Sequence, residues 1–208
     1  MNNRSAAFWD RVARRYAKMS MRNPADYEKT LDRIRAYLRP DDRVLELGCG
    51  TGTTALTLSA FVGTYIASDY SPEMIAIVNE KRSEAKVANL EVSVGEICDG
   101  SLPGGPFDVI LGFNLLHLLP NRRLAFDDIA QNLRPGGLFI SKTPCLGGLY
   151  RVLEPVVAVL RMMGKAPDFH FLSPACLEQE IRQAGFEIVE TGDYPKRPPR
   201  RYIVARKR

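Results

Sequence analysis

The chain has 208 residues, 45% of them hydrophobic and 25% charged, which is the balance of an ordinary globular protein and excludes a largely disordered one. No apolar run approaches the roughly 18–20 residues that span a bilayer, and the polar start of the chain lacks the apolar core of a signal peptide. We therefore expect one cytoplasmic domain over residues 1–208.

The net charge of +5 is spread unevenly along the chain. Residues 1–39 hold ten Lys or Arg against four Asp or Glu, and residues 196–208 hold seven basic residues and no acid, so the middle of the chain is acidic. Any long-range attraction of a partner should begin at these two basic ends. Because few aromatics alternate with the basic residues, nucleic acid is an unlikely partner.

Cysteine and histidine use argues against metal chemistry. The four cysteines are scattered without a C-x-x-C pair, and the chain has only two histidines. This pattern predicts reduced, partly buried thiols, no zinc site and no metal catalysis.

Two helices are predicted before the first strand. In residues 5–18 the apolar side chains Phe8, Val12 and Tyr16 recur at helical spacing. A second helix should begin near Pro24, which suits a first helical position, and end near Leu38. On the sequence alone, both helices could simply cover an edge of the sheet.

The stretch 44–52 is the organising feature of the chain. An apolar strand runs into a turn that contains Gly48, Gly50 and Gly52, and residues 53–60 then begin a helix. Glycine permits positive φ and close approach of a ligand. The free N–H groups of the helix start favour a polar or anionic ligand.

Further strands follow, each with polar residues at its carboxyl end. Strand 65–69 ends in Asp69, seventeen residues after Gly52, where an acid can bind the two hydroxyls of a ribose. Strands 90–94, 107–112 and 138–143 alternate with helices, one of which we expect to begin at Pro120 with Leu124 facing inward. This alternation predicts an α/β doubly wound sheet with one composite pocket at the strand ends. The residues that point to this pocket are Glu46, Asp69, Glu96 and Asn114.

The last third departs from a minimal fold. After a helix over 173–184, strands 186–191 and 201–205 should form an antiparallel hairpin. The segment 144–172 is an insert whose nine-residue apolar centre, 152–160, is too short to cross a bilayer. Topology places this insert and the basic loop 196–201 at the same edge of the sheet as the pocket.

Four phrases of the sequence resemble one known family. They are E-L-G-C-G-T-G, S-D-Y-S-P-E-M, the pair F-D-V-I and N-x-x-H around the fourth strand, and L-R-P-G-G-x-L-x-I. Together they resemble class I S-adenosylmethionine (SAM)-dependent methyltransferases, and the chain is most similar to the ubiquinone/menaquinone-biosynthesis type. The insert 144–172 has no counterpart in that type.

The resemblance implies a Rossmann-like sheet of seven strands, five or six of them parallel and the last antiparallel. It also implies an N-terminal helical lid over residues 1–39 and SAM as cofactor, with S-adenosylhomocysteine (SAH) as product. Glu46 would fix the amino group of SAM, Asp69 the ribose, and Glu96 the adenine, where Asp is commoner. The implied cofactor contacts are Tyr16, Glu46, Gly48, Cys49, Gly50, Gly52, Asp69, Tyr70, Met74, Glu96, Ile97 and Asn114.

His117 is the best candidate for a general base, because the pKa of a histidine lies near neutrality. The alternative is a histidine that merely packs at the start of a helix. A methyltransferase needs no protein nucleophile, since the cofactor supplies the electrophile.

The acceptor is left open by the sequence. The insert 144–172 could shape an apolar acceptor site and the loop 196–201 could attract an anionic group, or both could be plain surface features. The first interpretation predicts a small or lipid-like, anionic acceptor, with peripheral contact to an anionic membrane surface. An RNA or protein methyltransferase and a SAM-binding protein without catalysis are the alternatives.

Overall fold

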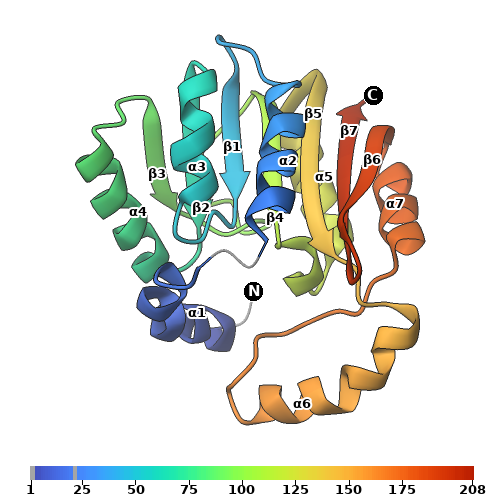
Figure 1. Cartoon of the computed structure of the whole chain (residues 1–208). Coiled ribbons are helices and arrows are strands. Elements are labelled where there is room, and N and C mark those ends of the chain that lie inside the picture. The colour runs from blue at the N-terminus through green and yellow to red at the C-terminus, as the bar shows by residue number, and fades with distance from the viewer. Residues whose placement is uncertain (1–2, 21–22) are drawn as a thin grey trace.

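The computed structural model describes residues 3–20 and 23–208. A single sheet runs through the molecule with helices on both faces (Figure 1). Its strands are β1 Arg43–Leu47, β2 Thr64–Asp69, β3 Leu90–Val94, β4 Phe107–Phe113, β5 Leu133–Pro144, β6 Phe186–Lys196 and β7 Pro199–Lys207. The α-helices are α1 Asn3–Ala17, α2 Pro24–Arg35, α3 Thr53–Leu58, α4 Pro72–Ala85, α5 Arg122–Asn132, α6 Glu154–Met162 and α7 Pro174–Gln183, and the short 3₁₀ helices are η1 Ser59–Phe61, η2 Leu116–Leu118 and η3 Gly148–Leu153.

The seven strands have the order β3-β2-β1-β4-β5-β7-β6. The pairs β1–β2, β2–β3, β1–β4 and β4–β5 are parallel, whereas β7 is antiparallel to both β5 and β6. The expected doubly wound sheet with one antiparallel strand is confirmed. Strand order reverses between β1 and β4, and ligands of open α/β sheets bind at this switch point.

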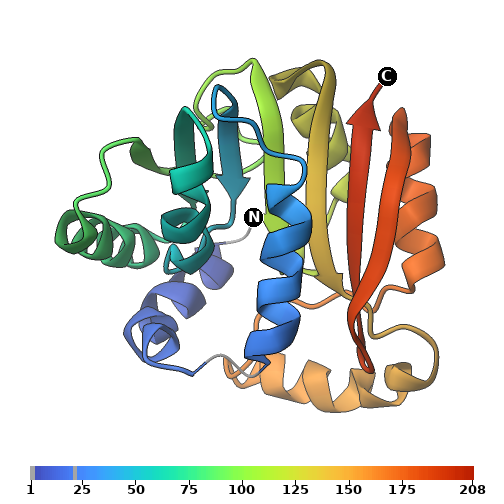
Figure 2. The ribbon, with the colours of Figure 1, turned by 45° about the horizontal axis from the view of Figure 1, so that its top comes forward.

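Two helical layers enclose the sheet (Figure 2). Helices α2 and α3 cover one face, where Leu31, Ile34 and Leu58 are buried in a core that includes Tyr65 and Tyr202. Helices α5 and α7 cover the other face. Residues 1–39 thus divide between two roles, because α2 belongs to a layer and only α1 lies at the edge of the sheet, where a lid was expected.

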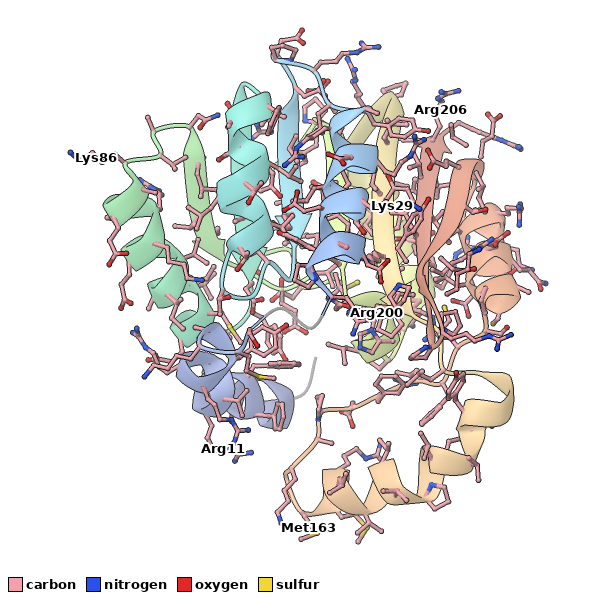
Figure 3. All side chains as sticks on the ribbon, viewed as in Figure 1. Arg11, Lys29, Lys86, Met163, Arg200 and Arg206 are labelled. Atoms are coloured by element: carbon pink, nitrogen blue, oxygen red, sulfur yellow. The ribbon has the colours of Figure 1, made fainter. Side chains whose placement is uncertain are left out.

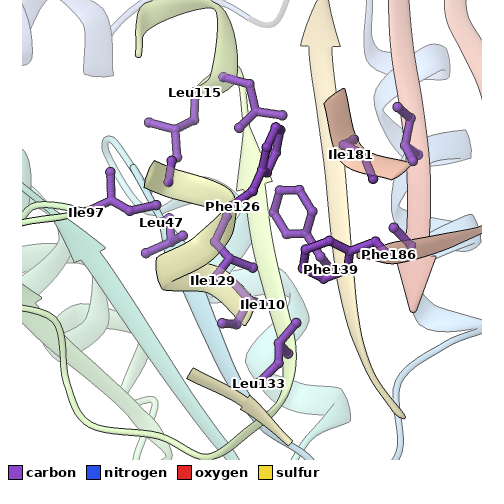
Figure 4. Packing of buried hydrophobic residues seen from close by; sticks show 14 of the residues in the cluster. Leu47, Ile97, Ile110, Leu115, Phe126, Ile129, Leu133, Phe139, Ile181 and Phe186 are labelled. Carbon is purple, nitrogen blue, oxygen red and sulfur yellow. The ribbon is translucent and has the colours of Figure 1, made fainter. Parts of the chain in front are cut away.

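The core under α5 and α7 extends to the switch point (Figure 4). Phe139 of β5 packs against Phe126 and Phe186, with ring centroids 6.2 and 6.1 Å apart. Leu47 and Leu115 belong to the same cluster and lie at the carboxyl ends of β1 and β4. The floor of the predicted pocket is therefore continuous with the packed core.

One expected helix begins later than its sequence suggests. Helix α5 begins at Arg122 and not at Pro120, because the Asn121 side chain accepts a hydrogen bond from Leu124 N at 3.2 Å and caps the helix there. The prediction that Leu124 faces inward was also wrong: it is 53% exposed, and Phe126 takes the buried place.

The insert 144–172 forms η3 and α6, and α6 lies away from the sheet at its lower edge (Figure 1). No residue of α6 is buried. The β6–β7 hairpin turns at the same edge, where Cys145 N donates to Pro199 O at 2.9 Å. The predicted placement of insert and basic loop at one edge is confirmed. Across residues 3–20 and 23–208, no helix combines the length and hydropathy needed to cross a membrane.

Candidate active site

The glycine turn between β1 and α3 is held by its neighbours in a conformation that only glycine adopts easily. Gly48, Gly50 and Gly52 have φ values of 63°, 55° and 73°. A Cβ on Gly52 would lie 2.8 Å from a methyl group of Val78, whereas one on Gly50 would meet nothing within 4 Å. The turn is therefore packed against α4 on one side and open on the other, as a ligand-binding turn must be.

Asp69 fastens this turn to the start of α4. Its carboxylate accepts from Gly50 N at 2.9 Å and from Ser71 N at 3.0 Å, and the side chain is 6% exposed. Burial raises the pKa of Asp69, and the two backbone donors partly offset that effect. A carboxylate has about four lone-pair positions, so the remaining ones can accept hydrogen bonds from ribose hydroxyls.

Glu46 lies beneath the turn and is 2% exposed. Tyr65 Oη donates to Glu46 Oε2 at 2.8 Å. Burial, together with the nearby Asp69 carboxylate, raises the pKa of Glu46 to about 8. The protonated carboxyl is thus poised to ionise when a cationic amino group binds beside it.

A cleft opens at the carboxyl ends of β1, β3 and β4. Within the described residues, Tyr70 Oη is buried without a hydrogen-bond partner. The cleft is lined by Leu47, Gly48, Tyr70, Gly95, Glu96, Ile97 and Leu115. Apolar walls, an aromatic ring and one acid are what an adenine ring with its exocyclic amino group requires.

The structure brings most of the predicted cofactor residues to this edge. Asn114 is exposed at the end of β4 with a φ of 52°, and its N–H donates to Lys142 O at 2.8 Å. Cys49 lies within the turn and is 8% exposed, and burial raises the pKa of its thiol. Their contacts with a cofactor remain predictions.

Two predicted cofactor residues have other neighbours. The Tyr16 ring is 43% exposed and lies edge-on to Trp9, with centroids 6.0 Å apart. Met74 is 2% exposed and packs with Ala13 and Ile77 between α1 and α4. Among the described residues, no hydrogen bond or ring contact links either side chain to the glycine turn. Their roles at the cofactor remain predictions.

Helix α1 is anchored firmly beside the site. Ser71 Oγ donates to Asp10 Oδ1 at 2.5 Å, so α1 contacts the cap of α4. Arg14 forms two hydrogen bonds with Glu80, at 2.6 and 2.8 Å. Arg11 reaches across to the insert and donates to Gly164 O, just after α6, at 2.6 Å. Through Arg11, α1 and the insert meet at the edge that carries the site, and we refer to α1 and α6 together as the cap.

His117 is buried in η2 and 7% exposed. Its ring meets Phe169 of the insert edge-on, with centroids 4.8 Å apart, and its carbonyl accepts from His170 N at 2.8 Å. Burial, with Arg200 and His170, lowers the pKa of His117 to about 4. Packing against Phe169 fits the structural interpretation. Within the described chain, Nδ1 lacks a hydrogen-bond partner, and the lowered pKa keeps the ring neutral near pH 7.

Sequence reasoning missed Lys142 of β5. Its side chain is 9% exposed, and Nζ donates to Thr30 Oγ1 of α2 at 2.6 Å. Burial, with the nearby Arg200, lowers the pKa of Lys142 to about 8. A lysine as the one charged residue of strand 138–143 was the signal that could have found it. Among the described residues, no group of three or more His, Cys, Asp or Glu could hold a metal ion.

Comparison with known proteins shows which family has this arrangement. A family model described as a methyltransferase domain matches residues 15–191. The chain belongs to this family. It is a class I SAM-dependent methyltransferase domain, and SAM is its cofactor, in agreement with the glycine turn, Asp69 and the cleft beside them.

The individual relatives differ widely in length and in the activity that their names state. A ubiquinone biosynthesis O-methyltransferase of Xanthomonas axonopodis pv. citri is 28% identical over 76% of this chain and 68% of its own length. A highly reducing polyketide synthase, lcsB, of Purpureocillium lilacinum is 32% identical over 57% of this chain but only 5% of its own length. The structure of a DhpI–SAH complex has a TM-score of 0.78 at 23% identity, covering 98% of this chain and 95% of that one. At that identity the likeness concerns the fold.

Proposed function

We propose that this domain moves the methyl group of SAM to a small or lipid-like acceptor that carries an anionic group. The observation that carries the proposal is the position of the insert: an apolar helix, α6, spans the edge of the sheet that holds the cofactor cleft. Bound SAM would supply a sulfonium methyl group, so the protein has to bind, orient and exclude water. Alignment of the two reactants contributes on the order of 7–11 kcal/mol.

The residues of the site divide this work. Glu46 and Asp69 would hold the amino acid and ribose portions, and the apolar walls of the cleft would hold the adenine. His117 is the candidate general base, because its neutral ring has an unpartnered Nδ1, but a pKa lowered to about 4 makes it a weak base in the protein without bound ligands. The cap formed by α1 and α6 supports a compact acceptor, because it crosses the edge that a long polymer would have to approach.

A lipid-like acceptor is supported by the exposed apolar side chains of α6. Val156 and Val159 are 57% and 56% exposed, and Met163, just after the helix, is 57% exposed. Basic residues such as Lys18 and Lys165 are exposed on the same cap. We therefore include peripheral contact with an anionic bilayer in the proposal, since each Lys or Arg near such a surface contributes about 1 kcal/mol.

Two measurements test the proposal in order. Calorimetric titration with SAM and SAH tests the donor side, and no binding at millimolar cofactor would overturn it. Release of SAH is then measured with lipid, small-metabolite, RNA and protein fractions of a cell extract. Turnover with the lipid or small-metabolite fraction alone is expected. Turnover only with RNA or protein, or SAM binding without turnover in any fraction, would overturn the acceptor class.

A further inference from the structure

Lys142 is a buried cation with one neutral partner. Its Nζ has three hydrogens to donate, and the hydrogen bond within the described residues goes to Thr30 Oγ1, which itself donates to Asp26 O at 2.7 Å. A buried ammonium without a paired acid is costly. Asp26 raises its pKa, but that influence is smaller than those of burial and Arg200, which lower it. The surroundings of Lys142 therefore lack a full counter-charge.

Arg200 adds a second cation beside it. In the β5–β7 ladder Arg200 is opposite Pro144 and Tyr202 is opposite Lys142, so Arg200 and Lys142 are diagonal neighbours on one face of the sheet. Diagonal neighbours are within reach of long side chains. Arg200 lies at the end of the sheet that faces α6 (Figure 3).

The adjacent arginine, Arg201, is by contrast held by two acids. Arg201, on the opposite face, donates to Glu178 Oε1 at 2.5 Å and to Asp193 Oδ2 at 3.0 Å. Arg200 has no ion pair within residues 3–20 and 23–208. One arginine of this dipeptide fastens α7 to the hairpin, and the other remains available for a ligand.

Both cations lie on the acceptor side of the cofactor site. Lys142 is opposite Phe113 in the β4–β5 ladder, next to Asn114, and β4 is in turn paired with β1. Neighbouring strands are about 4.8 Å apart, so Lys142 is about 10 Å from the end of β1 where the glycine turn begins. This is far enough from the donor for the remote end of a small acceptor.

We propose that Lys142 and Arg200 form the subsite for an oxyanionic group, a carboxylate or phosphate, of the methyl acceptor. The inference rests on the proposed function and names the group that selects its substrate. An oxyanion would supply the missing counter-charge for both cations and could accept a bidentate hydrogen bond from the guanidinium. Both residues are binding residues in this proposal and take no part in proton transfer.

The matched control lies on the same strand. Arg206 is on the same face of β7 as Arg200 but at the opposite end, opposite Leu138 (Figure 3). Benzoate and its neutral analogue benzyl alcohol are titrated by calorimetry into the SAH-bound protein. The wild type should bind benzoate on the order of 10-fold more tightly than benzyl alcohol, the difference expected for a charge-assisted pair. K142M and R200M should lose this preference, and R206M should keep it.

Three results would overturn the subsite. They are an equal affinity of the wild type for both compounds, a preference that survives in K142M and R200M, or a loss of preference in R206M. If K142M does not fold, R200M decides alone. A loss of SAH affinity in K142M or R200M, with the benzoate preference intact, would assign the cations to the carboxylate of the cofactor and overturn the acceptor assignment. Failure of the wild type to bind SAH would contradict the proposed function and is measured separately.

Discussion

The donor side and the acceptor side of this edge are built differently. On the donor side, the ends of β1 and β2 place Glu46, the glycine turn and Asp69 within a stretch of 24 residues. Backbone N–H groups donate hydrogen bonds to the Asp69 carboxylate. On the proposed acceptor side, α2, β5 and β7 bring together Thr30, Lys142 and Arg200, which are far apart in the sequence. The donor side is built from residues that are close in the sequence, whereas the proposed acceptor side is built from distant residues and lined by cations.

This difference explains what the sequence could predict. The glycine turn and Asp69 form a local motif whose chemistry follows from spacing, and the alternation of strands and helices gave the sheet. The Lys142–Thr30 contact depends on how α2 packs over β5, and no spacing encodes that. The start of α5 was missed because a side-chain cap at Asn121 overrode the helix-starting preference of Pro120.

The largest effect is expected at the donor turn. Gly52→Ala combines a left-handed backbone with a Cβ 2.8 Å from Val78, which together cost about 2–5 kcal/mol. Gly50→Ala carries the backbone cost alone, about 1–2 kcal/mol, because nothing lies near its Cβ. Urea unfolding of both variants measures the difference. Equal destabilisation would show that Val78 does not hold the turn.

Glu46 gives the donor side a dependence on pH. Its pKa is raised to about 8 in the fold, so its contribution to stability is full below the unfolded value and is lost as pH rises toward 8. The loss from about pH 5.5 to about pH 7.5 should be roughly 2–3 kcal/mol. Glu46→Gln, which still accepts a hydrogen bond from Tyr65, should abolish this slope and weaken SAM binding. Urea unfolding at both pH values checks the slope, and an unchanged slope in the variant would contradict a buried, protonated Glu46.

His117 should show the opposite dependence on the acceptor side. A histidine whose pKa is lowered to about 4 stabilises the fold above its unfolded pKa, and that stability is lost as pH falls from 6.5 toward 4. From about pH 6.5 to about pH 5 the loss should be roughly 1–2 kcal/mol. Titration of the two imidazoles by NMR, with His170→Gln for assignment, measures the pKa directly. Titration of His117 near 6.5 would mean that Phe169 does not keep water from the ring.

The smallest effect is expected at the outer surface of α6. Replacing Val156 and Val159 by Ser removes apolar area from the cap without disturbing the core, since neither side chain is buried. Binding to vesicles that contain anionic lipid should fall several-fold, in line with about 25 cal/mol for each Å² of apolar surface. Leu124→Ser, at an exposed residue of α5, serves as the control and should bind like the wild type. Equal binding by all three proteins would exclude α6 as the membrane contact.

The cap has one fixed half and one loose half. Helix α1 is held by Met74, Ile77 and the Arg14–Glu80 pair, whereas α6 has no buried residue and is joined to α1 through the exposed Arg11. Segments with few buried contacts open at the lowest free energy. Under the proposed function, an acceptor would therefore exchange by displacing α6 alone, while the helix beside the donor stays in place, so one cofactor-bound enzyme would sample many acceptors before it commits to one.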